Sequence, residues 1–245
     1  MHSAPRPAAT GDWQGWGLAQ QNVAALAQAP KVEAEEITIL TDDQIARLLK
    51  RVEGRTIRPI ISIGVATGAR RGELLALRIK DFDDKAQTLR IERSVEQTKA
   101  GLRIKPPKTK NGKRTISLPA FAAAELRAHI LRSNERRLAL GLGRVGGDDL
   151  LFPTWDGQLR SPNQISLKFR LALKSIGVTG ATFHSLRHTH ASALIAAGFD
   201  PLTISRRLGH GSATITLAVY GHLMRGTDPK AAEMIENIFG GLRTD

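Results

Sequence analysis

The sequence predicts an α+β fold that is mainly α-helical and contains one small antiparallel sheet of three strands. Two observations lead to this prediction. Apolar residues recur at helical spacing over most of the chain, and only residues 87–118 change to short alternating runs separated by glycine. No fixed-period repeat is visible. With 245 residues, the chain is long enough to bury a hydrophobic core and to fold alone.

Three helices are expected ahead of the sheet. Thr41-Asp-Asp-Gln44 is a capping-box pattern, and apolar residues follow it at helical spacing. A second helix is expected over residues 57–66, ending near Gly68, and a third over residues 71–77. The first 39 residues are rich in alanine and proline and only weakly periodic, so we interpret residues 1–39 as a leading segment or linker.

The predicted sheet consists of three alternating runs. They are Thr88–Ile91, Leu102–Ile104 and Arg114–Leu118. Asn111-Gly112 lies between the second and third runs, and this dipeptide is the strongest short signal for a two-residue hairpin turn. We therefore expect those two runs to pair with each other.

Helical periodicity returns after the sheet. A Gly-rich loop at 141–147 interrupts it, and a breaker at 226–229 separates the last helix from the rest. That last helix carries one apolar stripe and is expected to form a tail over residues 224–245. The helices expected in this half cover residues 120–138, 162–176, 184–197, 201–208, 213–220 and 230–239.

Composition restricts the partners and the chemistry. Lys and Arg number 36 against 23 Asp and Glu, giving a net charge of +13, so a polyanion such as nucleic acid is the expected partner. Aromatic residues are only 4% of the chain, which favours backbone and groove contacts over base stacking. The absence of cysteine excludes disulfides, thiolate zinc sites and cysteine nucleophiles. No apolar stretch is long enough to span a bilayer and no secretory signal is visible, so we expect a soluble, cytoplasmic protein.

Two segments in the first half could bind an anion. Arg70 follows an expected helix end, and Glu73 lies three residues later, close enough to orient its guanidinium. Such an arginine suits bidentate phosphate binding, although an ordinary helical ion pair would look the same. Residues 107–114 place four basic side chains, Lys108 among them, in or beside a predicted hairpin, which is also what a generic basic loop would contain.

Three histidines and an arginine lie near the start of one predicted helix. His184 and Arg187 share a face and could bind one anion together, where the helix N-terminus adds partial positive charge. His188 and His190 raise the alternative of a metal site. We set it aside because the glutamate of a zinc-peptidase helix and a third ligand are both missing.

The last candidates are His210 and Tyr220. His210 lies in a Gly-His-Gly turn between two expected helices, and Tyr220 is the only tyrosine of the chain. A single tyrosine is more often a packing residue than a nucleophile. In the company of two arginines, two histidines and a lysine, however, a phenol is the one remaining candidate that forms a stable phosphoester.

The order of these motifs resembles that of the tyrosine recombinases, the phage integrase family. The resemblance runs from about Leu40 to Leu223, and its closest stretch is Phe183–Leu223. Each motif is weak alone, but five in this order are specific. In chain order they are Thr67-Gly-x-Arg-x-x-Glu73, Pro107-Lys108-Thr109, His184-x-x-Arg187, Leu208-Gly-His210 and Tyr220.

The resemblance implies a tyrosine recombinase-like catalytic domain over residues 40–223 that cleaves and rejoins DNA strands through a 3'-phosphotyrosine, without a cofactor or a metal. It implies one role for each matching residue. Tyr220 is the nucleophile, and Arg70 and Arg187 bind the scissile phosphate. Lys108 protonates the leaving 5'-oxygen, His184 handles the tyrosine proton, and His210 donates to a phosphate oxygen. Glu73 supports these residues without contacting the phosphate itself.

Partners and location follow from the same resemblance. It implies binding to double-stranded DNA in the nucleoid, and self-association there, as a tetrameric synapse, through the C-terminal helix. Family members usually carry a preceding helical domain that clamps the other face of DNA, and residues 1–39 resemble only the end of such a domain. Two alternatives stay open: a type IB topoisomerase-like relaxase with the same residues, and a catalytically silent DNA-binding regulator. The complete set from Arg70 to Tyr220 argues against the silent regulator.

Overall fold

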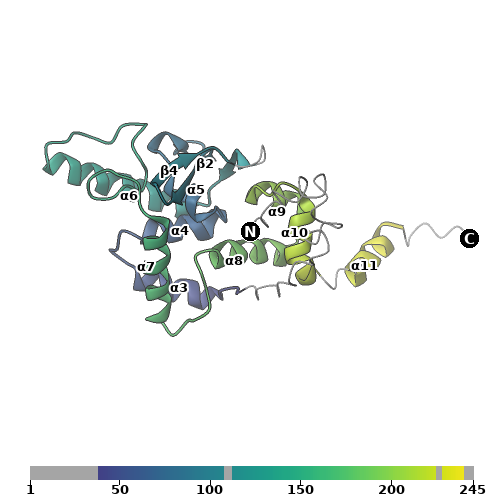
Figure 1. The fold of residues 1–245 in the computed structure, drawn as a ribbon. Helices are drawn as coiled ribbons and strands as arrows, with labels where there is room; N and C mark the ends of the chain where they lie inside the picture. The colour runs from purple at the N-terminus through teal and green to yellow at the C-terminus, as the bar shows by residue number, and fades with distance from the viewer. Residues whose placement is uncertain (1–37, 108–111, 225–227, 240–245) are drawn as a thin grey trace, which may run out of the picture. The chain divides into compact units, whose positions relative to one another are not determined.

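The computed structural model describes residues 38–107, 112–224 and 228–239, and most of its ordered elements are helices (Figure 1). Thr41 caps the first of them with both bonds of a capping box, so this sequence prediction is confirmed. The next helix ends at Gly68, which adopts the left-handed conformation with φ 62°. The elements before the sheets are α3 (Asp42–Arg51), α4 (Arg58–Thr67), α5 (Arg71–Leu75) and the 3-10 turn η1 (Ile79–Asp81).

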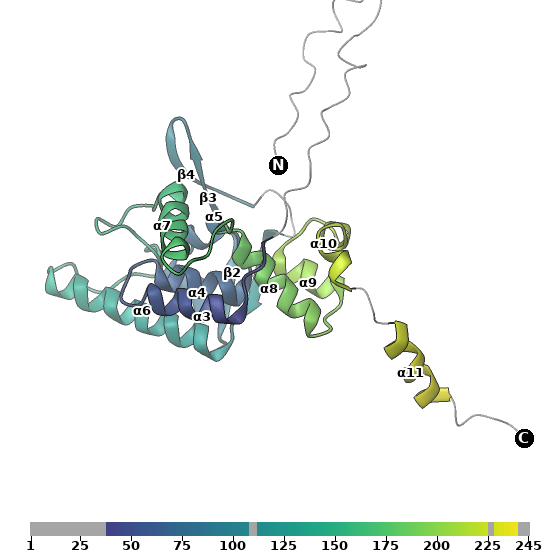
Figure 2. The ribbon, with the colours of Figure 1, turned by 90° about the horizontal axis from the view of Figure 1, so that it is seen from below.

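The strands form two separate antiparallel sheets. One has three strands in the order β1-β2-β5, and the other is a hairpin of β3 and β4, which projects from the helices in Figure 2. In the first sheet Leu89 pairs with Ile116, and both side chains are buried. The strands are β1 (Phe82–Asp83), β2 (Thr88–Ile91), β3 (Ser94–Thr98), β4 (Gly101–Lys105) and β5 (Arg114–Ser117).

A three-stranded antiparallel sheet is therefore present, but its membership differs from the prediction. Leu102–Ile104 belongs to β4, which pairs with β3 and not with the run that begins at Arg114. That run pairs instead with β2, in a register that joins Ile91 to Arg114. The expected pairing across Asn111-Gly112 is wrong because each of its two runs finds a different partner. Residue 111 itself lies outside the described residues.

The second half of the chain is helical, as predicted. Pro162 and Pro201 occupy the first turns of their helices, where a missing N–H costs nothing. Within the described residues, no helix combines the length and the apolarity needed to cross a bilayer. The helices are α6 (Ala120–Ala139), α7 (Pro162–Lys174), α8 (Ser185–Ala196), α9 (Pro201–Leu208), α10 (Ala213–Tyr220), η3 (Gly221–Met224) and α11 (Asp228–Phe239).

Two hydrophobic clusters lie on either side of α8. The larger one contains α4, the buried face of β2 and the aromatic pair Phe169 and Phe183, whose rings meet edge to face at 5.3 Å. The smaller one joins Ala191 of α8 to residues of α9 and to Tyr220 of α10. Because α8 packs against both α4 and α9, side chains from both halves of the domain meet around its first turns (Figure 1).

Candidate active site

The sequence-predicted residues converge where several helices begin or end. Arg70 directly precedes α5, and Arg187 lies in the first turn of α8. His210 follows the end of α9 and Tyr220 is the last residue of α10. Residues far apart in the chain are thereby brought to one place.

Arg187 is the buried centre of this place. Its side chain is only 2% exposed, and its Nη1 donates to the carbonyl of Gly68 at 2.9 Å. Its Nη2 is buried and makes no hydrogen bond within the described residues. Burial, followed by repulsion from Arg70, lowers the pKa of Arg187 to about 9. A buried cationic donor without a partner is costly, and an anion in the site would relieve that cost.

Arg70 is held by two acceptors and remains accessible. Its Nη1 forms an ion pair with Glu73 Oε1 at 2.9 Å, and both Nη atoms reach the carbonyl of Gly209 at 3.4 Å. The side chain is 43% exposed, so an incoming ligand can contact it. The predicted orientation of Arg70 by Glu73 is therefore present in the structure.

Glu73 also holds a second arginine that the sequence did not assign to the site. Arg114 of β5 donates to Glu73 Oε2 at 2.8 Å and, through Nε, to the carbonyl of Arg207 at 2.8 Å. Burial tends to raise the pKa of Glu73, but the hydrogen bonds and charges of Arg114 and Arg70 outweigh it, and the net effect lowers the pKa. Arg114 lies in the basic run 107–114, and only its pairing in the fold distinguishes it from the other cations there.

We expect Glu73→Gln to lower the free energy of unfolding by about 3 kcal/mol, because it leaves the buried guanidinium of Arg114 without its counterion. Urea denaturation at neutral pH measures this. The difference between the two proteins should shrink in acid, since a carboxylate with a lowered pKa stabilises the fold above its ordinary pKa and stops doing so as pH falls through the lowered value. Glu96→Gln is the control, because the half-buried Glu96 pairs with Arg103 and Lys105 on the projecting hairpin, and equal losses would contradict the expectation.

His210 is nearly buried and neutral at physiological pH. Its Nδ1 and the Thr216 hydroxyl are 2.8 Å apart. Burial, then the charges of Arg187 and Arg70, lower its pKa to about 3. A neutral histidine among arginines can donate a hydrogen bond without adding a further charge.

Tyr220 is 1% exposed and shares a hydrogen bond of 2.8 Å with Nδ1 of His188. Burial raises its pKa to about 12, against a smaller opposing effect of Arg187. At pH 7 only about one phenol in 10⁵ would then be ionised, so attack through this oxygen requires a proton acceptor.

His184 lies one ring further from the phenol than the sequence led us to expect. Its ring meets that of His188 edge to face, with centroids 4.7 Å apart, and His188 in turn meets Tyr220. The side chain of His184 is exposed, yet loss of solvation and then the electrostatic effects of the His188 ring and of the cations Arg187 and Arg70 lower its pKa to about 4. Sequence reasoning considered His188 only as a metal ligand. Its contact with Tyr220 depends on how α8 packs on α10.

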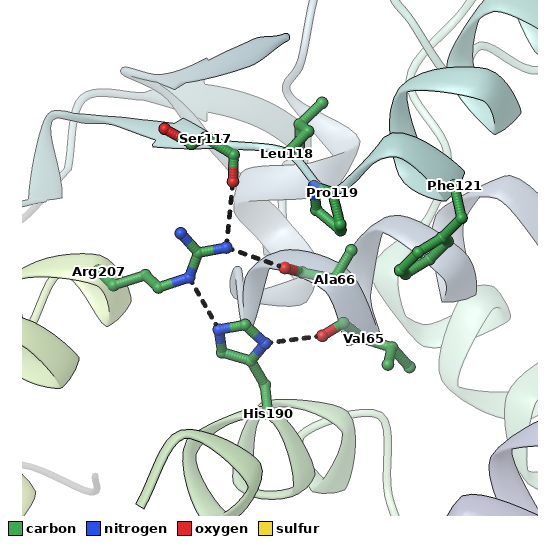
Figure 3. A pocket seen from close by; sticks show the side chains of 8 residues that line it. All are labelled: Val65, Ala66, Ser117, Leu118, Pro119, Phe121, His190 and Arg207. Carbon is green, nitrogen blue, oxygen red and sulfur yellow. Dashed lines mark hydrogen bonds between the residues drawn. The ribbon is translucent and has the colours of Figure 1, made fainter. Parts of the chain in front are cut away.

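His190 points away from this contact, toward an open pocket of about 460 Å³ (Figure 3). Arg207 donates from Nε to His190 Nε2 at 3.0 Å, so the ring proton is on Nδ1 and is donated to the Val65 carbonyl at 2.8 Å. Arg207 also donates to the carbonyls of Ala66 and Ser117 at 3.1 Å each. These bonds connect α8, through His190, and α9, through Arg207, to α4 and β5. His188 and His190 thus have different partners.

Lys108 and Arg71 are two further basic residues in or beside the motifs. Lys108, expected to act as an acid, lies outside the described residues. Arg71, the neighbour of Arg70, hydrogen-bonds Ser166 of α7. Neighbouring arginines therefore have different partners, and Arg70 is the one that shares Glu73 with the site.

A buried arginine, a second accessible one, neutral histidines and a phenol make a cationic site suited to a phosphodiester and to nucleophilic attack on it. Residues 38–226 match the model of the phage integrase family, and the chain belongs to this family. A tyrosine recombinase XerC-like protein of Caldanaerobacter subterraneus subsp. tengcongensis is 29% identical over 222 residues, covering 85% of this chain. The chain spans 56% of that relative's length.

Two solved structures share the fold. The integrase of transposon Tn1549, in complex with transposon right end DNA, superposes with a TM-score of 0.68 at 22% identity, covering 89% of this chain and 70% of that one. A lambda integrase tetramer bound to a Holliday junction gives a TM-score of 0.58 at 22% identity, covering 89% of this chain and 57% of that one. Both likenesses confirm the predicted recombinase-like fold.

Proposed function

We propose that this chain is the catalytic domain of a site-specific DNA recombinase that cleaves and rejoins strands through a 3'-phosphotyrosine. The observation that carries the proposal is that Nη2 of buried Arg187, in the site that also holds Arg70 and Tyr220, makes no hydrogen bond to any residue that the structure describes. A phosphodiester supplies the negative charge that this donor lacks. The net charge of +13 suits a DNA duplex as the larger ligand.

In each direction of the reaction, one bond between phosphorus and oxygen forms and another breaks. The Tyr220 oxygen attacks phosphorus and forms an O–P bond, while the bond to the 5'-oxygen breaks and that oxygen takes up a proton. Rejoining reverses these steps with the 5'-hydroxyl of the same or another strand. No external energy source is needed because one phosphoester replaces another.

The cationic residues stabilise the negative charge that develops on the phosphorane oxygens. Arg70 and Arg187 contact two of these oxygens and His210 donates to them, each such donor contributing about 10²- to 10³-fold in rate. The ion pair with Glu73 keeps the Arg70 guanidinium oriented toward the phosphate, and Lys108 protonates the leaving oxygen. His184 assists with the tyrosine proton, at one ring's distance from the phenol.

Covalent capture tests the proposal. A nicked DNA substrate that loses the 5'-fragment after cleavage should trap the chain as an adduct, and peptide mapping should place the phosphate on Tyr220. A silent DNA-binding regulator would bind the same DNA without an adduct. A type IB relaxase would form the adduct but relax supercoiled plasmid without exchanging strands between two duplexes.

The second part of the proposal concerns assembly on DNA. Residues 40–223 form the catalytic domain, and residues 224–245 form a tail whose helix α11 docks on a neighbouring copy in a tetrameric synapse at the nucleoid. The support is the exposure of Met234, Ile235 and Ile238 on α11, each more than half exposed. The structurally similar lambda integrase is a tetramer on its junction DNA.

We expect a chain ending at Leu223 to bind a single DNA site as a monomer but to lose cooperative assembly on paired sites. The reason is that the apolar stripe of α11 is removed while the buried site residues remain. Gel shifts over a range of protein concentrations measure the cooperativity. A truncated chain that melts much earlier and still assembles would show instead that α11 packs on its own domain.

A further inference from the structure

We propose that His188 is a further catalytic residue, which takes the proton of the Tyr220 hydroxyl at Nδ1 during cleavage and returns it during rejoining. This inference rests on the proposed function, because it concerns the attacking oxygen of the same reaction. It assigns the proton to a residue that directly contacts that oxygen.

The first support is the contact itself. His188 Nδ1 and the Tyr220 hydroxyl are 2.8 Å apart, within the distance a general base requires. A phenol O–H is more acidic than the N–H of neutral imidazole, so the hydroxyl donates and Nδ1 accepts. In this tautomer the ring proton of His188 is on Nε2, and Nδ1 has the lone pair that a proton acceptor needs.

Burial of the phenol makes this acceptor important. Tyr220 is 1% exposed and packs with Ala191, Ile204 and Leu208, so its hydroxyl does not face bulk water. His188 is half-buried and connects the phenol to the exposed ring of His184 one helical turn earlier. The buried Tyr220 ring contacts the His188 ring, and the His188 ring contacts the exposed His184 ring, so His188 connects the phenol to the surface.

Bound DNA would make His188 a stronger base. In the absence of DNA, burial and then the charge of Arg187 lower the pKa of His188, which disfavours a second cation beside the arginine. A phosphodiester on Arg187 offsets that charge, so the imidazolium formed during attack is better tolerated. The phenol therefore keeps its proton until a phosphate is in place.

The proton count closes over both directions. In cleavage the tyrosine O–H bond breaks, Nδ1 gains the proton, the O–P bond forms, and the 5'-oxygen leaves with a proton from the acid. In rejoining the 5'-hydroxyl gives its proton back to the acid as its oxygen attacks phosphorus, the bond from phosphorus to the tyrosine oxygen breaks, and Nδ1 returns its proton to that oxygen. His188 is then neutral again, so no net proton is gained or lost at this residue.

Two substitutions separate a base from a residue that only positions the phenol. Asparagine at 188 can place its side-chain oxygen near the position of Nδ1 and accept the hydrogen bond, but it cannot take the proton at neutral pH. We expect His188→Asn and His188→Ala both to slow adduct formation on the nicked substrate by about 100-fold, with DNA binding within about twofold of wild type. A purely positioning role predicts that His188→Asn cleaves almost normally while His188→Ala does not.

A more acidic phenol provides the second readout. Difluorotyrosine incorporated at position 220 loses its proton more easily, so it should restore His188→Asn by about tenfold or more while changing the wild-type chain much less. The inference would be overturned if His188→Asn cleaved DNA at a rate within about threefold of wild type, or if difluorotyrosine at position 220 did not restore its cleavage. Loss of DNA binding by both variants would also overturn it, since His188 would then be structural. If the wild-type chain itself forms no adduct, the proposed function fails instead.

Discussion

We expect Tyr220→Phe to abolish covalent capture of nicked DNA, because the substitution removes the only atom that can form the phosphotyrosine. The phenyl ring still fills the space among Ala191, Ile204 and Leu208, so the small cluster keeps its packing. The adduct is measured by denaturing gel electrophoresis after incubation with excess substrate.

DNA binding is the control for this variant. The lost hydroxyl makes a hydrogen bond with His188, and its removal should lower the free energy of unfolding by only about 1 kcal/mol. Affinity for an intact duplex should therefore stay close to wild type. An adduct that persists in the Phe variant would assign the nucleophile to another residue and overturn the proposed chemistry.

The second large effect is expected at Arg187. Arg187→Lys keeps a positive charge, but its donors all lie on one nitrogen, whereas the arginine uses Nη1 for the Gly68 carbonyl and has the separate Nη2 for a phosphate oxygen. Cleavage should therefore slow by about 100-fold or more, and Arg187→Ala, which also leaves an emptied buried site, should be slower still. Single-turnover cleavage at saturating DNA measures the rate directly.

Arg70 and Arg71 provide a matched pair for this test. Arg70→Ala should slow cleavage about as much as the change at Arg187, since in the proposed mechanism both guanidinium groups bind the same phosphate. Arg71→Ala removes an equal charge one residue later, but its partner is Ser166 on α7, so cleavage should be close to wild type. Similar losses at 70 and 71 would point to a general electrostatic effect of the basic surface.

Local signals predicted the helices well and the strand pairing poorly. The Thr41 capping box and the left-handed Gly68 are decided by neighbouring residues, so they could be read from the sequence. Pairing between β2 and β5 joins Ile91 to Arg114, with a whole hairpin between them. The Asn111-Gly112 signal favoured the shorter connection, but β3 at Ser94–Thr98 had not been foreseen and takes β4 as its partner.

The candidate site shows the same division between features that neighbouring residues determine and contacts that tertiary packing determines. Motif order led to Arg70, Glu73, Arg187, His210 and Tyr220, which the structure gathers around the ends of four helices. It did not lead to His188, whose partner is 32 residues away, or to Arg114, which meets Glu73 across 41 residues. Contacts of this kind depend on tertiary packing, and a short spacing pattern contains no information about them.

The carbonyls of two glycines face the two arginines. Gly68 and Gly209 both end helices with positive φ, 62° and 68°, and the carbonyl of each accepts a hydrogen bond from Arg187 or Arg70. A side chain at Gly68 would also collide with Leu208, 2.6 Å from the position of its Cβ. Besides the Glu73 carboxylate that pairs with Arg70, uncharged backbone at two helix ends thus orients the guanidinium groups. In a mutational scan of this protein, the glycines of the Thr-Gly and Leu-Gly pairs should be as intolerant of substitution as the charged residues, and engineering that alters specificity should leave them in place.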